Sequence, residues 1–179
     1  MGMLMRHLAR ERLERLGRRM RWTVRGFMLL GLAAVLFVLG EKGPLGLVTV
    51  PADIAVDPRL LAVPRGLAVA AVGLLEPAAW LLAAALLDRL FGLYARGVVF
   101  SSQNTALVRR AGWALVAIDG VRMAKSALTG PVLTWIGATR PYVRVELQVS
   151  VAVVGLFVVA VGWVTEFGRE LDEDERLTI

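Results

Sequence analysis

Four charged side chains interrupt otherwise apolar stretches of this 179-residue chain: Glu76, Asp119, Arg122 and Lys125. Ionisable groups at membrane depth are costly, and they are typical of a proton or ion relay or of a polar cavity for a ligand. A buried salt bridge that fixes helix register is the simpler interpretation. We favour it because a relay needs more titratable groups in series than this sequence offers.

The spacing of these residues predicts how they pair. Glu76 lies about 18 Å before Asp88 along a helix, and Arg122 lies about 18 Å beyond Arg110, at 1.5 Å per residue. Both positions are then at similar depth on helices joined by a short loop, which predicts a Glu76–Arg122 ion pair. Asp119 precedes Arg122 by three residues and shares its helix face, so one arginine is expected to bridge two carboxylates.

The sequence has few residues that could form disulfides, metal sites or catalytic triads. The chain has no Cys and one His, His7, which excludes disulfides, thiolate ligands and histidine-based metal sites or triads within the apolar region. The sequence also shows no nucleophile–base pair and no phosphate-binding loop. We therefore expect no enzymatic activity, no metal and no cofactor.

The composition indicates the elements that must hold the four charges. Apolar residues make up 57% of the chain and charged residues 20%, with a mean hydropathy of +0.64. Soluble proteins average about 45–50% and 25%. The ends, 1–25 and 166–179, hold 18 of the 36 charges. This distribution indicates an integral membrane protein, in which the net charge of +6 reflects topology. Direct nucleic-acid binding is not expected, since no basic stripe is interleaved with aromatic residues.

A spanning helix needs about 20 mostly apolar residues. The sequence predicts four spans, with Gly130-Pro131 ending or kinking the third; they cover residues 22–40, 66–87, 108–129 and 147–165. Residues 1–25 hold eight arginines, and four more, Arg89, Arg96, Arg109 and Arg110, lie between the end of the second span and the first residues of the third. The positive-inside rule therefore places both termini in the cytoplasm. The expected fold is a single all-α membrane domain, a four-transmembrane-helix bundle.

The segments outside the spans carry further patterns. β-branched runs at 47–51, 53–56 and 142–146 predict a short β element in the outer loops. Residues 1–21 combine helical spacing of apolar residues with many arginines. This pattern fits an amphipathic helix on the anionic inner leaflet, or only an orientation signal.

Two cytoplasmic stretches are not explained by membrane insertion alone. Gly97 permits a turn, Phe100 would anchor it in the interface, and Ser101 or Ser102 can cap the third helix. A turn with its cap is the simpler interpretation of this loop, and a docking surface is the alternative. The second stretch is the acidic tail 166–179, which is either solvated or captured by a partner or by the basic loop.

Both stretches resemble a bacterial membrane family known as domain of unknown function 2975. Its pattern combines a basic–Gly–x–x–Phe–Ser/Thr–x–x–Asn element with an acidic tail ending in Leu-Thr-Ile. Here these are Arg96-Gly97-Val98-Val99-Phe100-Ser101-Ser102-Gln103-Asn104 and residues 166–179. The pattern leaves out residues 1–20 and Glu76. The resemblance implies four spans in a bacterial inner (plasma) membrane. Because members are often encoded beside a small helix-turn-helix regulator, it also implies such a partner.

These observations lead to one leading functional hypothesis and one alternative. The first is a non-enzymatic membrane protein that presents its loop and tail to a cytoplasmic partner such as a DNA-binding regulator. The candidate partner-binding residues are Arg96, Gly97, Phe100, Asn104, Glu170, Leu177 and Ile179. The alternative is a small transporter, channel or ligand-sensing subunit built around Glu76, Asp119 and Arg122. The expected partners are the lipid bilayer and this cytoplasmic protein, with a homo-oligomer left open.

Overall fold

The computed structural model consists of long α-helices with a short 3₁₀ helix after the first. In order they are α1 (Gly2–Lys42), η1 (Gly43–Leu47), α2 (Arg65–Tyr94), α3 (Ser102–Trp135) and α4 (Ser150–Leu177). The structure describes the backbone of residues 2–57, 61, 64–98 and 101–177, and within these ranges the side chains of residues 11–168. Three helices are long and apolar enough to cross a membrane, namely α1, α2 and α4.

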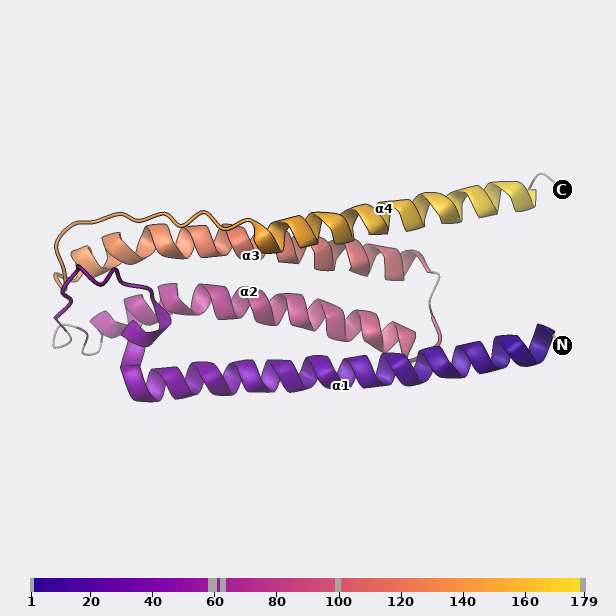
Figure 1. Cartoon of the computed structure of the whole chain (residues 1–179), viewed down its shortest axis with the longest axis horizontal. Coiled ribbons are helices and arrows are strands. Elements are labelled where there is room, and N and C mark those ends of the chain that lie inside the picture. Colours follow the sequence, from indigo (N-terminus) through magenta and orange to yellow (C-terminus); the bar gives the residue numbers. More distant parts are fainter. Residues whose placement is uncertain (1, 58–60, 62–63, 99–100, 178–179) are drawn as a thin grey trace.

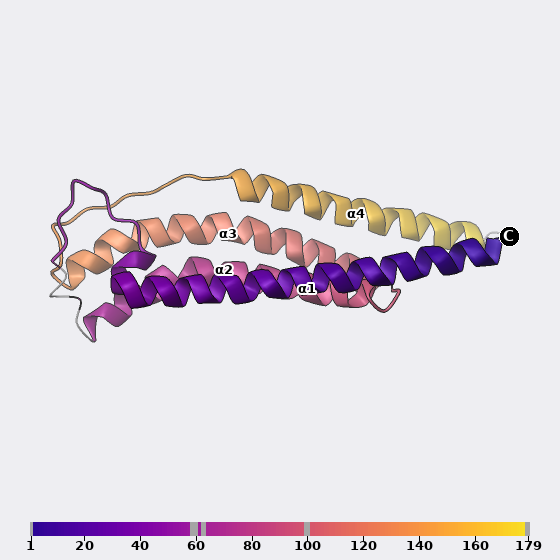
Figure 2. The same cartoon turned by 60° about the horizontal axis from the view of Figure 1, so that its bottom comes forward.

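The helices lie side by side in an elongated bundle (Figures 1 and 2). α3 packs against both α2 and α4, whereas α1 packs mainly against α2. Residues 43–57 and the first residues after α3 lie at one end, which we call the loop end, and the chain then returns along α3 to the start of α4 (Figure 1). Both chain termini and the α2–α3 turn lie toward the other end, which we call the termini end (Figure 1).

Glycines set the closest helix contacts. A Cβ on Gly155 of α4 would lie 2.6 Å from the carbonyl oxygen of Gly112 on α3. A Cβ on Gly17 of α1 would lie 2.6 Å from the backbone nitrogen of Ala95, just after α2. Small residues of this kind let helix backbones approach where no hydrophobic effect drives the helices together.

The predicted β element is wrong for the described residues, since none of them forms a strand. Leu47 ends η1, and the later loop segments lack regular structure. One backbone hydrogen bond, from Asp57 N to the carbonyl of Ala138 at 3.1 Å, joins the two loops. Their apolar side chains pack instead on a core of Val69, Leu133, Ile136 and Ala138. Packing against helix ends therefore replaces strand pairing.

The helices are also longer than the predicted spans. α1 is continuous from Gly2 to Lys42, so the basic segment prolongs the first span and forms no separate helix. Gly130-Pro131 does not end α3, which continues to Trp135; the carbonyl of Gly130 accepts a hydrogen bond from Thr134 Oγ1 at 2.9 Å. α4 starts at Ser150 rather than 147 and continues through the acidic tail to Leu177.

Candidate functional site

The four charged residues of α2 and α3 form one cluster. Arg122 Nε lies 2.8 Å from Glu76 Oε1, which confirms the predicted interhelical pair. Arg122 Nη1 lies 3.6 Å from Asp119 Oδ1, so the arginine does bridge two carboxylates. Lys125 completes the cluster, with Nζ 3.0 Å from Glu76 Oε2. Each charge is thus offset by an opposite charge, as burial away from water requires.

Asp119 has a second role that joins α3 to α4. Asp119 is 3% exposed, and its Oδ2 accepts a hydrogen bond from the backbone nitrogen of Ala152 at 2.8 Å. Ala152 lies in the first turn of α4, whose leading N–H groups have no partner within the helix. A carboxylate at this position satisfies one such group and stabilises the positive end of the helix dipole. Asp119 therefore fixes where α4 begins.

The chain before α4 supplies the remaining wall of the site. Residues 141–149 run alongside α3 without helical structure (Figure 1). Apolar side chains on this segment point outward, with Val143 71% and Leu147 75% exposed. The alternate side chains face the cluster, and Gln148 Oε1 accepts from Arg122 Nη1 at 3.0 Å. Glu146 N donates to Ser126 Oγ at 3.1 Å, which holds the segment on α3.

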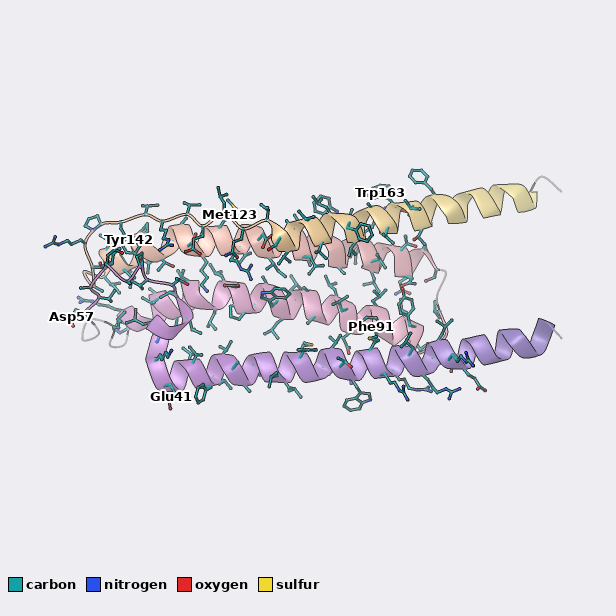
Figure 3. All side chains as sticks on the ribbon, viewed as in Figure 1. Glu41, Asp57, Phe91, Met123, Tyr142 and Trp163 are labelled. Carbon is teal, nitrogen blue, oxygen red and sulfur yellow. The ribbon has the colours of Figure 1, made fainter. Side chains whose placement is uncertain are left out.

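A polar cavity of about 250 Å³ opens between these elements. The residues that line it are all polar or charged in type: Thr49, Glu76, Arg122, Lys125, Ser126, Thr129, Tyr142, Arg144, Glu146 and Gln148. Burial raises the pKa of Tyr142 above its usual value, and its hydroxyl has no hydrogen-bond partner among the described residues. Figure 3 shows Tyr142 at the loop end of the bundle.

The cluster lies close to the loop end of α1. Glu76 and Lys125 share a small pocket with Val38 of α1. Val38 is four residues from Lys42, where α1 ends, which corresponds to about 6 Å of helix. Glu76 lies about 18 Å from Asp88 in the other direction. In a membrane, the nonhelical backbone of residues 141–149 beside this cluster would need protein contacts or a water-filled cavity around it.

A second group of ion pairs marks the termini end. Arg21 and Arg25 of α1 both contact Asp88 of α2, at 3.2 Å and 2.8 Å. Arg109 of α3 pairs with Glu166 of α4. The Arg109 guanidinium also lies 4.7 Å from the ring centre of Trp163, a cation–π contact. These pairs link neighbouring helices where the apolar stretches end.

The α2–α3 turn has the predicted local structure. Gly97 adopts a φ of 75°, a value that favours glycine, and Val98 N donates to the Leu93 carbonyl at 3.1 Å in the manner of a Schellman motif. Ser101 is the helix cap, since its hydroxyl accepts from Asn104 N at 3.2 Å. Arg96 is exposed and Asn104 is buried.

Four other candidate docking residues fall wholly or in their side chains outside the part of the chain that the structure describes. Phe100 and Ile179 lie outside the described residues, and the side chains of Glu170 and Leu177 lie outside the described side chains. The polar wall at 142–148 is the part of the site that sequence reasoning missed. The feature that could have revealed this wall is the alternation of polar and apolar residues from 142 to 148. The same alternation fits the predicted strand at 142–146 and the start of the predicted span at 147.

The arrangement can hold a polar solute or stabilise helix packing. Among the described residues, no group of three His, Cys, Asp or Glu side chains is placed to hold a metal ion. The fold and the site thus define an all-helical protein of membrane type with a polar, charge-balanced cavity at its loop end.

The chain belongs to the family described as protein of unknown function (DUF2975), whose model matches residues 12–179. The match begins within the first 20 residues, so part of that segment does belong to the family. No curated protein and no solved structure matches this chain.

Proposed function

We propose that this protein crosses a bacterial inner membrane four times, with both termini in the cytoplasm. Three helices support spanning by length and composition, and α3 lies between α2 and α4 along the bundle. Its charged residues are paired with Glu76 and with one another, which lowers the cost of placing them in a membrane. The arginines of α1 and of the α2–α3 turn favour a cytoplasmic termini end.

The absence of Cys from the sequence allows a direct test of this orientation. Single substitutions Ser102→Cys and Asp53→Cys place thiols at exposed positions of opposite ends. In intact spheroplasts, a membrane-impermeant maleimide should label the Asp53→Cys variant only, and permeabilised cells should label both. If intact spheroplasts label the Ser102→Cys variant alone, the protein has the opposite orientation and the proposed one is wrong.

Within this membrane placement the protein acts as a non-enzymatic interaction protein. The observation that carries this proposal is that α1 and α4 both extend past the α2–α3 turn at the termini end (Figure 1). α1 extends about 28 Å beyond Arg21, and α4 extends about 16 Å beyond Glu166. The first extension is rich in arginine and the second in acidic residues, so one partner could engage two helices of opposite charge.

The docking residues we propose belong to the turn and to the end of α4. The turn contributes Arg96, Gly97, Phe100 and Asn104, and the tail contributes Glu170, Leu177 and Ile179. A DNA-binding regulator of helix-turn-helix type is the partner that the family resemblance suggests. Binding at the membrane would then control how much regulator reaches DNA.

Co-purification with a helix-turn-helix regulator, taken from beside the gene where one is encoded there, tests this proposal. Full-length protein should retain the regulator, and a chain truncated after Gly168 should lose it. Arg140→Gln/Arg144→Gln removes two charges at the loop end and serves as the control that keeps binding. Equal retention by the truncated chain, or no retention by the full-length chain, would contradict the proposal.

A second candidate function is favoured by the polar cavity. A small transporter or ligand-sensing subunit would bind a polar solute between Glu76, Arg122 and the 141–149 segment. Proteoliposome flux should then fall on Glu76→Gln and on Arg122→Ala. Unchanged flux in both variants, or no flux with the parent protein, would remove the transport alternative.

A further inference from the structure

A cationic cavity of about 410 Å³ lies at the termini end between α1, α2 and α3. Its charged and polar lining includes Arg21, Asp88, Arg89, Arg96, Gln103 and Arg110. Asp88 is already paired with two arginines of α1. Among the described side chains, Arg89, Arg96 and Arg110 take part in no ion pair, so the cavity has an excess of positive charge.

An apolar groove of about 650 Å³ lies between α1 and α2, with one contribution from α3. Residues that line it include Val24, Met28, Gly31, Ala84, Leu87 and Leu115. Polar atoms are nearly absent from its surface. A groove of this kind on the outside of a membrane helix pair faces lipid chains, not water.

The cavity and the groove follow one another along the same helix faces. On α2, Ala84 of the groove precedes Asp88 of the cavity by four residues. On α1, Arg21 of the cavity precedes Val24 of the groove by three residues. Residues three and four apart lie on one face of a helix, so the charged part continues directly into the apolar part.

From this continuity we propose that the protein binds one anionic phospholipid of the leaflet at its termini end. The headgroup phosphate lies among Arg89, Arg96 and Arg110, which donate charge-assisted hydrogen bonds to its oxygens. One acyl chain occupies the groove. From Leu87 to Leu74 the groove extends about 20 Å along α2, which exceeds the half-thickness of a hydrocarbon core of about 30 Å.

This inference goes beyond the partner role proposed above and depends only on the membrane placement. Basic pockets between membrane helices commonly take anionic headgroups. A soluble phosphate or an acidic peptide would fill the cavity but would leave the groove without an occupant. The apolar continuation is therefore what selects a phospholipid.

Trp80 lines the groove and provides a local probe. Full-length protein retaining only this tryptophan, with the other four replaced by Phe, is reconstituted in phosphatidylcholine vesicles. Small mole fractions of brominated phosphatidylglycerol or brominated phosphatidylcholine are then added. We expect phosphatidylglycerol to quench Trp80 with an association constant about tenfold higher than phosphatidylcholine, given the attraction of several arginines. Equal quenching by the two lipids would overturn the proposal.

Charge variants separate a specific site from general attraction to an anionic surface. Arg89→Gln/Arg110→Gln should lower the preference for phosphatidylglycerol about tenfold. Arg18→Gln/Arg19→Gln removes the same charge from exposed positions of α1 outside the cavity and should leave the preference unchanged. Equal losses in both pairs would show surface attraction only and would overturn the proposal.

Two glycines of α1 test the groove itself. Gly31 lines the groove and Gly26 does not, and a Cβ would meet nothing within 4 Å at either position. Gly31→Leu should lower phosphatidylglycerol binding severalfold, whereas Gly26→Leu should not. Glycerol phosphate should compete weakly because it lacks an acyl chain. Competition by glycerol phosphate at the lipid's own affinity would identify a free-phosphate site and overturn the lipid proposal.

Native mass spectrometry of the unmodified protein gives a measurement that does not depend on the tryptophan replacements. Protein released from detergent should retain one phosphatidylglycerol and lose phosphatidylcholine at the same collision energy. Retention of both lipids to the same extent would count against the site. The thiol-labelling experiment is independent of this result, so failure of the lipid site and failure of the membrane orientation remain distinguishable.

Discussion

The two ends of the bundle hold charges in different ways. At the loop end, the side chains of Asp119 and Glu76 are 4% and 22% exposed. Their ion pairs join α2 to α3, and a hydrogen bond from Ala152 N to Asp119 joins α3 to the start of α4. At the termini end, Asp88 is 19% exposed, but its partners Arg21 and Arg25 are 36% and 44% exposed, against 27% for Arg122 and 14% for Lys125. The cluster of Glu76, Asp119, Arg122 and Lys125 is balanced in charge, whereas the termini end has unpaired arginines among the described side chains.

This difference shows what each set of charges can do. A buried charge that loses its partner remains uncompensated, so every member of the loop-end cluster is structurally important. Exposed pairs are screened by water and salt and contribute little to stability. The termini-end arginines are therefore free to bind something else, such as a headgroup or a protein. Four predictions test this comparison, beginning with the largest expected effect.

Replacing Asp119 should have the largest effect on stability. Asp119→Ala removes the partner of Arg122 and the acceptor for the first turn of α4, so we expect a loss of about 4 kcal/mol. Thermal unfolding in detergent, followed by circular dichroism, measures it. Asp119→Asn keeps a hydrogen-bond acceptor for Ala152 N and should lose less. Equal losses for both variants would contradict the capping role.

Removing Glu76 should be nearly as damaging, and removing its lysine partner as well should repair part of the damage. Glu76→Leu leaves the Lys125 ammonium without its carboxylate, at an expected cost of about 3 kcal/mol. Glu76→Leu/Lys125→Leu should be more stable than Glu76→Leu alone. A double variant whose loss equals the sum of the single losses would show that the two residues do not interact.

Asp88 should matter much less, although it contacts two arginines. Asp88→Asn should cost less than about 1 kcal/mol, since its partners are more than a third exposed and screened by solvent. The difference from the parent protein should shrink further at high salt, because exposed charges are screened. A loss as large as that of Glu76→Leu would remove the contrast between the two ends.

The smallest effect concerns the pH at which Tyr142 ionises. Burial raises the pKa of Tyr142 above its usual value of 10.0. The folded protein therefore keeps this proton to higher pH than the unfolded chain, and its stability should decline as pH rises above 10. Phenolate absorbance should show a late component that Tyr142→Phe removes and that Tyr94→Phe leaves. A single component at the usual pKa would contradict the burial of Tyr142.

Local and periodic features of this protein were predictable from the sequence. The first three apolar segments fall within long helices, and the fourth begins three residues before α4. The Ser101 cap and the Gly97 turn depend on residues only a few positions apart. The Glu76–Arg122 pair also followed from the sequence, because helical rise converts residue number into depth with little error. The spacing of three residues on one helix face predicted the Asp119–Arg122 contact.

Partners that depend on how helices rotate and pack were decided by the tertiary structure. Lys125 shares Glu76 with Arg122, and Asp119 caps α4, because α3 turns these faces toward its two neighbours. Residues 142–146 alternate as a strand would, yet they line a cavity because α3 and the loop core occupy the positions where a pairing strand would lie. The sequence alone determined where the helices lie in the chain and how far along them the charged residues stand, because both follow from the regular rise of a helix. Only the packed bundle decided which faces meet, since that depends on contacts between residues far apart in the chain.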